Sequence, residues 1–493
     1  MQPGNFVPGA GLKDTANTML EEALMTKTPT EAKRDSESNT STRLAFTILA
    51  TVQGTLIFTI ALIMIPLPVI ADEFSLSSSQ ILLLQVAYGL PFSGLLLFGG
   101  RLTDRYGPRR MFTTGLTIFA IASLAAPTTS SFDVLIAMRF LQGIGGAIVA
   151  PAALGVVRSL YPGMAGFGRA MAIWGGVSVV GAVLGFISSG MIASVVSWRW
   201  MFAVPVAVSL LGLVTTSSLL PATPPADRTQ RPGLDPLGAL LATSGIILSS
   251  YALIVSQDTI WLSVEVLGPL AMGILLLIAF LIVERKVRDP LLPPTFLRNP
   301  VRLNGLAGML LAAAGATLIQ FVLLLYLQQM RGWTSLETAA SFIPFAVALI
   351  GTSFLTASVV GRFGAKTVTV AGFLIGGAGL ALIAFISQDT EYLEVLLPGQ
   401  VLLAIGMALV FAGAAVLSTV NVPEQQMGLA GGVMNTAMEL GPTVGFTILM
   451  AVAATRPNGV DGYALAFGTA SAAYVFAASV ALAVTSKPPA SQA

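Results

Sequence analysis

One acidic side chain lies in the middle of a long apolar run, where a carboxyl group is suited to binding and releasing a proton. Glu439 lies ten residues into the run from Leu429 to Ala454, which places it about 15 Å into a helix that rises 1.5 Å per residue. Burial disfavours the charged form of a carboxyl group. Asn435 and Pro442 share its helical face, and the proline leaves the carbonyl group of Met438 without its helical partner. Glu439 is therefore our candidate for proton coupling, and a permanently protonated, hydrogen-bonded glutamic acid is the structural alternative.

A second charge inside an apolar run is Arg139, about six positions into the segment from Val134 to Val157. An arginine at this depth costs at least ~2.5 kcal/mol, so its guanidinium group should face a partner or a water-filled cavity. Gln142, Gly143 and Gly146 follow on the same helical face, which is polar and then closely packed. The alternative is that Arg139 lies near the membrane surface and extends its side chain into water.

Charge is also concentrated in the eleven residues GRLTDRYGPRR, which begin at Gly100 and connect two apolar runs. Gly100 and Gly107 permit close approach and a tight turn. Asp104, expected near the start of the following helix, can accept bonds from free amide groups and pair with Arg105 or Arg109. Because such an ion pair must break when the helices part, we expect it to stabilise one conformation. The alternative is that the arginines only mark the cytoplasmic side.

The elements that carry these residues are membrane-spanning helices. The chain is 55% hydrophobic and 10% charged, with a mean hydropathy of +0.84, values typical of an integral membrane protein. A bilayer core requires about 20 apolar residues per helix. The predicted spans are 44–71, 81–100, 111–126, 134–157, 171–196, 201–220, 237–255, 266–283, 306–327, 339–360, 368–386, 396–420, 429–454 and 464–484.

The basic residues predict the orientation of these fourteen spans. Lys and Arg are retained on the cytoplasmic side during insertion, and 21 of the 25 fall on one side when both termini are cytoplasmic. Residues 1–43, rich in Ser, Thr, Glu and Lys towards their end, are expected to form a disordered cytoplasmic tail, and 486–493 a second tail. The net charge of +2 therefore reflects topology and does not indicate a nucleic-acid partner.

The absence of cysteine and histidine excludes several kinds of chemistry. A disulfide, a thiolate nucleophile, a haem or a Cys/His metal site cannot exist, so proton transfer has to use carboxyl groups, water or tyrosine. A soluble catalytic domain has no place between the spans. We therefore expect no enzyme activity, no cofactor and no metal.

An internal repeat predicts the domain organisation. The segment GRFGAK after the tenth span corresponds to GRLTDRYGPRR after the second, and Gly364 aligns with Gly107. A duplicated six-helix unit accounts for this correspondence. The predicted all-α architecture has six-helix bundles at 44–220 and 306–485, and a connector with an inserted helix pair at 221–305.

Four stretches carry a family resemblance: GRLTDRYGPRR, RFLQGIGGA from Arg139, WRWMF from Trp198 and GLAGGVMNTAMELGPTVG from Gly428. With its span count, the sequence resembles the major facilitator superfamily, and within it the fourteen-span drug:proton antiporter group. The resemblance implies two bundles of inverted repeats and assigns Arg139 to proton transfer or to holding a transport carboxyl group. It implies a gating role for Gly100, Asp104, Arg105, Gly107, Arg109 and Arg110.

The sequence departs from the pattern of this group at two places. Thr59 stands where the group usually carries an acidic residue in the first span. In the fifth span Gly181 and Gly185 are kept, but the proline and the last glycine of the antiporter motif are lost. Small residues still permit close helix packing. Recognition of multiply charged cations is not expected.

Other polar side chains within the spans are candidates to line a central cavity or, alternatively, to hydrogen-bond between helices. They are Gln53, Gln85, Tyr88, Gln142, Gln320, Tyr326, Gln400 and Asn435. An adaptable apolar pocket could be formed by Phe58, Met64, Trp174, Phe321 and Met434.

These features predict a monomeric secondary active transporter in the cell membrane. It would export an apolar or weakly cationic organic compound, such as a drug, a toxin or the cell's own metabolite, by alternating access and proton antiport. The alternatives are uptake of a nutrient or siderophore by proton symport or facilitated diffusion, and a non-transporting membrane receptor or scaffold.

Overall fold

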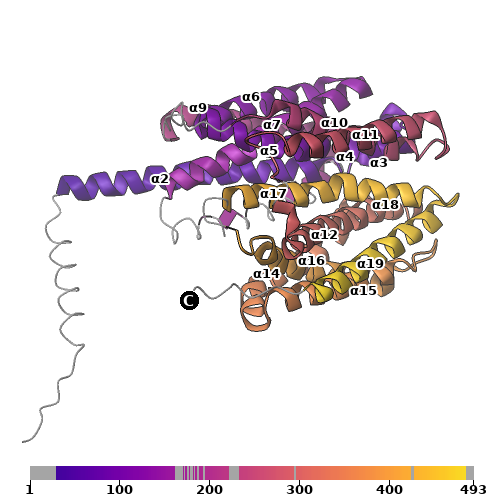
Figure 1. Ribbon diagram of the computed structural model, residues 1–493. Helices are drawn as coiled ribbons and strands as arrows, with labels where there is room; N and C mark the ends of the chain where they lie inside the picture. The colour runs from indigo at the N-terminus through magenta and orange to yellow at the C-terminus, as the bar shows by residue number, and fades with distance from the viewer. Residues whose placement is uncertain are drawn as a thin grey trace, which may run out of the picture. The chain divides into compact units, whose positions relative to one another are not determined.

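The computed structural model describes residues 29–161, 195–220, 233–293, 296–422 and 427–484, and short runs between 170 and 192. Every regular element in these residues is a helix (Figure 1). Two compact units are present, Met1–Ile48 and Leu49–Ala493. The described part of the first unit is the beginning of α2 (Pro29–Leu62), and all other elements belong to the second unit.

The elements before residue 220 are α2 (Pro29–Leu62), α3 (Leu67–Phe74), α4 (Ser78–Val86), α5 (Gly89–Tyr106), α6 (Pro108–Ala125), η1 (Ala126–Thr128), α7 (Phe132–Leu160), η2 (Trp198–Phe202) and α9 (Ala203–Leu219). The inserted pair is α10 (Pro236–Val255) and α11 (Val264–Glu284). The later elements are η3 (Phe296–Arg298), α12 (Pro300–Leu325), η4 (Tyr326–Met330), α13 (Ser335–Ser341), α14 (Ile343–Phe363), α15 (Ala365–Ile383), η5 (Tyr392–Leu396), α16 (Leu397–Ser418), α17 (Met427–Leu440), η7 (Gly441–Gly445), α18 (Phe446–Ala453) and α19 (Gly459–Ala483).

Thirteen helical segments among the described residues are long and apolar enough to cross a membrane. Each overlaps one predicted span, which confirms thirteen of the fourteen. The predicted fifth span, 171–196, falls partly outside the described residues, and those that are described between 170 and 195 are helical. The tails 1–28 and 485–493 also lie outside them.

The first span differs from its prediction at both ends. Its helix begins at Pro29, inside the segment expected to be a disordered tail, and ends at Leu62. Residues 63–66 form a turn, and a separate helix follows from Leu67. Pro66 and Pro68 explain this break, because proline cannot donate the backbone hydrogen bond that continues a helix.

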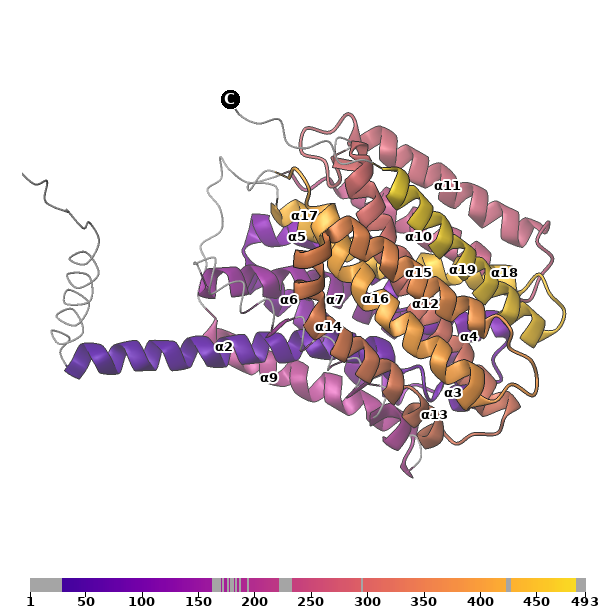
Figure 2. The ribbon, with the colours of Figure 1, turned by 90° about the horizontal axis from the view of Figure 1, so that it is seen from below.

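Within Leu49–Ala493 the same packing order occurs twice. In the first half α7 packs on α5 and α6, and α6 packs on α9, whereas in the second half α16 packs on α14 and α15, and α15 packs on α19. Figure 1 shows the two sets of helices as an upper and a lower layer, and Figure 2 shows the second set in front. Gly107 and Gly364, with φ of 93° and 80°, end α5 and α14 in matching turns. The repeat read from the sequence is therefore present in the backbone.

The inserted helix pair touches both halves. α10 packs on α11 and also contacts α4 and α5 of the first half and α18 of the second. In the loop between the two helices, Asp258 accepts a hydrogen bond from the backbone N–H of Ser79 at 3.1 Å. The neighbouring Gln257 side chain donates to the carbonyl oxygen of Met450 at 2.9 Å. The pair is thus a bridge between the halves.

Close packing of α5 on α7 depends on Gly99. A Cβ atom at this position would collide with the carbonyl oxygen of Ala147, whereas one at Gly100 would meet no atom within 4 Å. The close approach that the sequence assigned to Gly100 therefore belongs to its neighbour. The reason is rotation: adjacent residues on a helix face directions about 100° apart.

Candidate functional site

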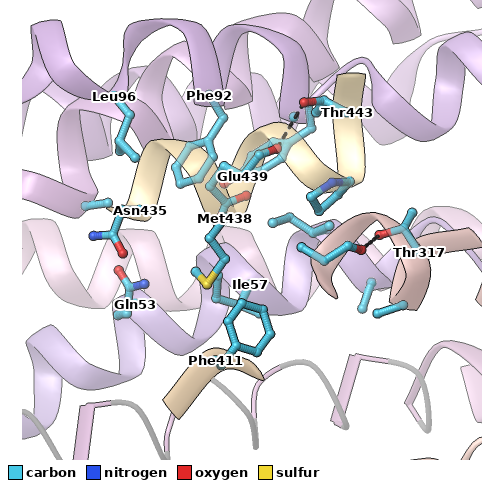
Figure 3. A pocket seen from close by; sticks show the side chains of 18 of the residues that line it. Gln53, Ile57, Phe92, Leu96, Thr317, Phe411, Asn435, Met438, Glu439 and Thr443 are labelled. Carbon is cyan, nitrogen blue, oxygen red and sulfur yellow. Dashed lines mark hydrogen bonds between the residues drawn. The ribbon is translucent and has the colours of Figure 1, made fainter. Parts of the chain in front are cut away.

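A cavity of about 1230 Å³ lies between the two halves of the unit Leu49–Ala493. Its wall is formed by α2, α4, α5 and α7 from the first half and by α12, α14, α16 and α17 from the second. Figure 3 shows Phe92, Phe411 and Met438 pointing into the same space as Gln53 and Asn435. Most of the wall is apolar, with a few convergent polar groups, as is typical of sites for small organic molecules.

The cavity is open at one end and closed at the other. Asp104 and Arg158, in the last turns of α5 and α7, line the open end with exposed side chains. At the opposite end Gln328 of η4 donates to the carbonyl oxygen of Ile65 at 3.4 Å. The two halves also touch on the cavity wall, because a Cβ atom on Gly89 would collide with the side chain of Thr443.

Glu439 lies on the cavity wall at the end of α17, with a relative exposure of 7%. The π-turn η7 follows it at Gly441, and Thr443 donates to the Glu439 carbonyl oxygen at 3.0 Å (Figure 3). Such a turn interrupts the helix and is frequent at functional sites. Among the described residues, none donates a hydrogen bond or forms an ion pair with the Glu439 carboxyl group. The permanent hydrogen bond of the structural alternative is therefore not found in this part of the chain.

Arg139 is fully buried at 0% exposure and also lines the cavity. Its Nη1 atom donates to the Thr59 carbonyl oxygen and to Gln142 Oε1, each at 3.2 Å. The guanidinium carbon lies 5.2 Å from the centre of the Tyr88 ring, a cation–π distance. Within the described residues Nε and Nη2 have no hydrogen-bond partner. The charge is thus held by neutral groups and does not extend to the surface.

Tyr88 connects the two buried charged positions. It lies within electrostatic range of both Glu439 and Arg139, and its ring stacks on Phe92 at 5.5 Å. In the described part of the chain its hydroxyl group has no hydrogen-bond partner. The cavity wall therefore carries three ionisable groups near one another: the Glu439 carboxyl group on α17, and the Tyr88 hydroxyl group and the Arg139 guanidinium group on the first half.

The motif that begins at Gly100 is arranged differently from the expectation. Asp104 lies in the last turn of α5 and not at the start of the next helix, because the positive φ of Gly107 ends α5 at Tyr106. Arg109 donates to the carbonyl oxygen of Ser217 at 3.0 Å.

The cations that act electrostatically on Asp104 are Arg101 and Arg158. Arg105 lies 5.9 Å from the Tyr106 ring, and Arg110 is exposed. Of the two cations that act on Asp104, Arg101 belongs to the motif and Arg158 comes from the end of α7. Gly100, Arg101, Thr103 and Asp104 line the cavity.

The structure places five of the eight predicted polar residues on the cavity wall: Gln53, Gln85, Tyr88, Gln320 and Asn435. The other three are engaged between helices. Gln142 donates to Ser123 Oγ at 2.9 Å, the Tyr326 hydroxyl group contacts three carbonyl oxygens of residues 387–390, and Gln400 donates to the Ser341 carbonyl oxygen.

Of the predicted apolar pocket, Met64 and Trp174 line the cavity, whereas Phe58, Phe321 and Met434 do not. Sequence reasoning missed Phe92, Phe342, Phe345, Phe411 and Met438 on the wall. Spacing could have identified two of them, since Phe92 is one turn from Tyr88 and Met438 is adjacent to Glu439.

A second charged cluster lies outside the cavity, in the WRWMF stretch that forms η2. Arg199 pairs with Glu73 at 2.7 Å, and the Trp198 indole donates to the same carboxyl group at 2.7 Å. Hydrogen bonding from Arg199, the largest effect, together with that from Trp198 outweighs burial and holds the pKa of Glu73 below its ordinary value. This cluster ties η2 to α3.

Comparison with known sequences identifies a family. A sequence profile described as Major Facilitator Superfamily matches residues 47–446 and 305–492. The puromycin resistance protein of Streptomyces alboniger is 32% identical over 435 residues, which cover 88% of this chain and 84% of that protein. The cephamycin export protein of Amycolatopsis lactamdurans is 32% identical over 438 residues, which cover 88% and 90%.

Comparison with solved structures shows that membrane transporters share the fold of this chain. A peptide transporter in complex with sulfate gives a TM-score of 0.64 at 15% identity, over 89% of this chain and 94% of that one. An auto-inhibited peptide transporter gives 0.63 at 14% identity, over 89% and 96%. These likenesses support the arrangement of two helical bundles around a cavity and carry no information on what this cavity binds.

Proposed function

The chain belongs to the major facilitator superfamily, and from this premise we propose that it exports a small organic compound across the cell membrane by alternating access in exchange for protons. It is a multi-pass membrane transport protein and not an enzyme. Its similarity to resistance and export proteins supports efflux. The observation that carries the proposal is the cavity between the halves, with the buried carboxyl group of Glu439 on its wall.

The open end of the cavity is proposed to face the cytoplasm. Arg101 and Arg158 line it, and basic residues are retained on that side during insertion. Both termini then lie in the cytoplasm, and the state described here receives its substrate from inside the cell. Rocking of the bundles 44–220 and 306–485, joined by the connector 221–305, would close this end and open the other.

Glu439 is the proposed coupling group. A proton bound to it from the outside is released to the inside when the cavity faces the cytoplasm, and a weakly cationic substrate is attracted by the ionised carboxylate. Proton and substrate then exclude one another, which is the condition for antiport. Arg139 and Tyr88 are proposed to tune this group through their charge and dipole.

The cavity chemistry supports an apolar substrate with few polar groups. Phe92, Phe342, Phe345 and Phe411 provide flat apolar surface, and the flexible Met438 adapts to irregular shapes. Gln53, Gln320 and Asn435 are proposed to orient the substrate by hydrogen bonds. The relatives named for puromycin resistance and cephamycin export suggest antibiotics as the first compounds to test.

Asp104 is proposed to gate the open end. Arg101 and Arg158 attract it electrostatically. Arg101 is on the same helix as Asp104, and Arg158 is on α7. An ion pair formed with either of them at this exposed site would be weak, about 0–1 kcal/mol, which suits a contact that forms and breaks in each cycle. The protein is proposed to work as a monomer.

The test is transport of lipophilic fluorescent dyes and antibiotics into everted membrane vesicles, with and without an imposed proton gradient. We expect gradient-driven accumulation in the parent and its loss in Glu439→Gln. Glu394→Gln is the matched control, since this carboxyl group is exposed and away from the cavity. Normal gradient-driven transport by Glu439→Gln would contradict the coupling role. Accumulation only in right-side-out vesicles would support uptake instead.

A further inference from the structure

Two carboxyl groups meet where the inserted helix pair ends. Asp235 precedes α10 and accepts a hydrogen bond from the N–H of Gly238 at 2.9 Å. Glu284 ends α11 and accepts from the N–H groups of Leu291 and Leu292 at 3.3 and 3.0 Å. The two carboxyl groups lie next to each other, because a Cβ atom built on Gly238 would collide with both Asp235 Oδ2 and Glu284 Oε1.

Both groups are buried, Asp235 at 8% and Glu284 at 2% exposure. Within the described residues Asp235 Oδ2 has no hydrogen-bond partner, and the one charge that acts on Glu284 is that of Asp235. The charged residues on the adjoining segments, exposed or bonded elsewhere, are Arg101, Arg285, Lys286, Arg288 and Asp289. Two adjacent buried carboxylates repel one another strongly, so one proton between them is required for this contact.

The segment that Glu284 holds forms part of the mouth of the cavity. Leu291 and Pro293 line the cavity. The carbonyl oxygen of Pro290 accepts a hydrogen bond from Arg101, which also lines the open end and attracts Asp104. The carboxyl pair is therefore connected to the gate through the backbone of 289–293.

We propose that Asp235 and Glu284 bind one proton between them, and that this proton latches the segment 289–293 onto the inserted helix pair at the mouth of the cavity. When the proton leaves, the two carboxylates repel, and Leu291, Pro293 and the Pro290 carbonyl oxygen are released from the mouth. Its effect on transport rests on the proposed function, in which this end faces the cytoplasm. The inserted pair then senses cytoplasmic protons separately from Glu439.

The test follows the motion of a spin label on Leu292→Cys, the one thiol in a chain that otherwise contains no cysteine. In the purified full-length protein, between about pH 5 and about pH 9, we expect an immobile spectrum at low pH that becomes mobile as pH rises. In Asp235→Asn the amide donates to Glu284 without a titrating proton, and both Glu284 oxygens still accept from the N–H groups of Leu291 and Leu292, so the label should stay immobile throughout.

Glu265→Gln is the matched control, because Glu265 is an exposed carboxyl group in the first turn of the same helix as Glu284, and it should keep the full pH response. The proposal is overturned if the label on the parent ignores pH, or if Asp235→Asn keeps the parental response. The measurement needs neither substrate nor gradient. A failure of transport would therefore refute the proposed function, whereas the proton shared by Asp235 and Glu284 is tested by the spin label alone.

Discussion

Gly89 and Thr443 provide a direct way to lock the two halves together at the cavity wall. A Cβ atom built on Gly89 lies 4.0 Å from the Cβ atom of Thr443, and disulfides join Cβ atoms about 3.5–4.5 Å apart. Since the chain has no native cysteine, the double variant Gly89→Cys with Thr443→Cys contains only the two introduced thiols. We expect oxidation to form one intramolecular disulfide between α5 and η7.

This disulfide should stop transport, because alternating access requires the two halves to move relative to one another. We expect a loss of at least about tenfold, corresponding to about 1.4 kcal/mol against opening, measured as dye accumulation in vesicles before and after oxidation. After treatment with a reducing agent, the double variant should transport at the rate of the single variant Thr443→Cys. That single variant is the proper reference, because it already lacks the hydroxyl bond to the Glu439 carbonyl oxygen.

The matched controls are the single variants Gly89→Cys and Thr443→Cys. Each contains one thiol and cannot form an intramolecular disulfide, so oxidation should leave its transport rate unchanged. Undiminished transport by the cross-linked Gly89–Thr443 variant would refute the alternating-access reasoning.

Two further predictions concern stability. Gly99→Ala should lower the free energy of unfolding by about 1–3 kcal/mol, because its Cβ atom would collide with the Ala147 carbonyl oxygen. Gly100→Ala is the control, since its Cβ atom would meet open space and should leave the melting temperature unchanged. Equal melting temperatures for the two variants would contradict this packing. Arg199 helps to lower the pKa of Glu73 below its ordinary value on folding. This carboxyl group therefore stabilises the fold at neutral pH, and the contribution fades as pH falls below the ordinary pKa of a glutamic acid. The melting temperatures of the parent and Glu73→Gln should accordingly converge in acid, and a gap independent of pH would exclude the ion pair as its cause.

The spans and the buried charges could be predicted because each depends on a local property of the chain. An apolar run of helical length has one stable position in a bilayer, and a charge such as Glu439 or Arg139 inside that run needs a protein or water environment. Helix boundaries were less predictable. Asp104 was assigned to the wrong helix because the turn is made at Gly107, three residues later, where a glycine with positive φ is followed by proline.

Which polar side chains face the cavity could not be predicted from one sequence. Tyr326 and Gln142 are the same residue types in the same kind of apolar run as Tyr88 and Gln53, which line the cavity. The side chains of Tyr326 and Gln142 instead form hydrogen bonds to neighbouring parts of the protein. The rotation of each helix depends on all its neighbours, which local patterns do not encode. The pairing of Asp235 with Glu284 was missed for the same reason, because it depends on how α10 packs on α11.

Because Thr59 stands in place of the usual acidic residue, Arg139 has no carboxylate partner at this position in the first span. Arg139 is always charged and is held by the Thr59 carbonyl oxygen and by Gln142, both neutral, so Glu439 is the buried carboxyl group on the described wall that can offset it. Protonation of Glu439 therefore leaves the buried part of the cavity positive, which repels a cation and attracts an anion. By linkage, a cationic substrate lowers the affinity for the proton as much as the proton lowers the affinity for the substrate. With Glu439 as the proposed coupling group, exchange of protons for cations and co-transport of protons with anions would be two outcomes of the same pair of charges, and the charge of the substrate would decide between them.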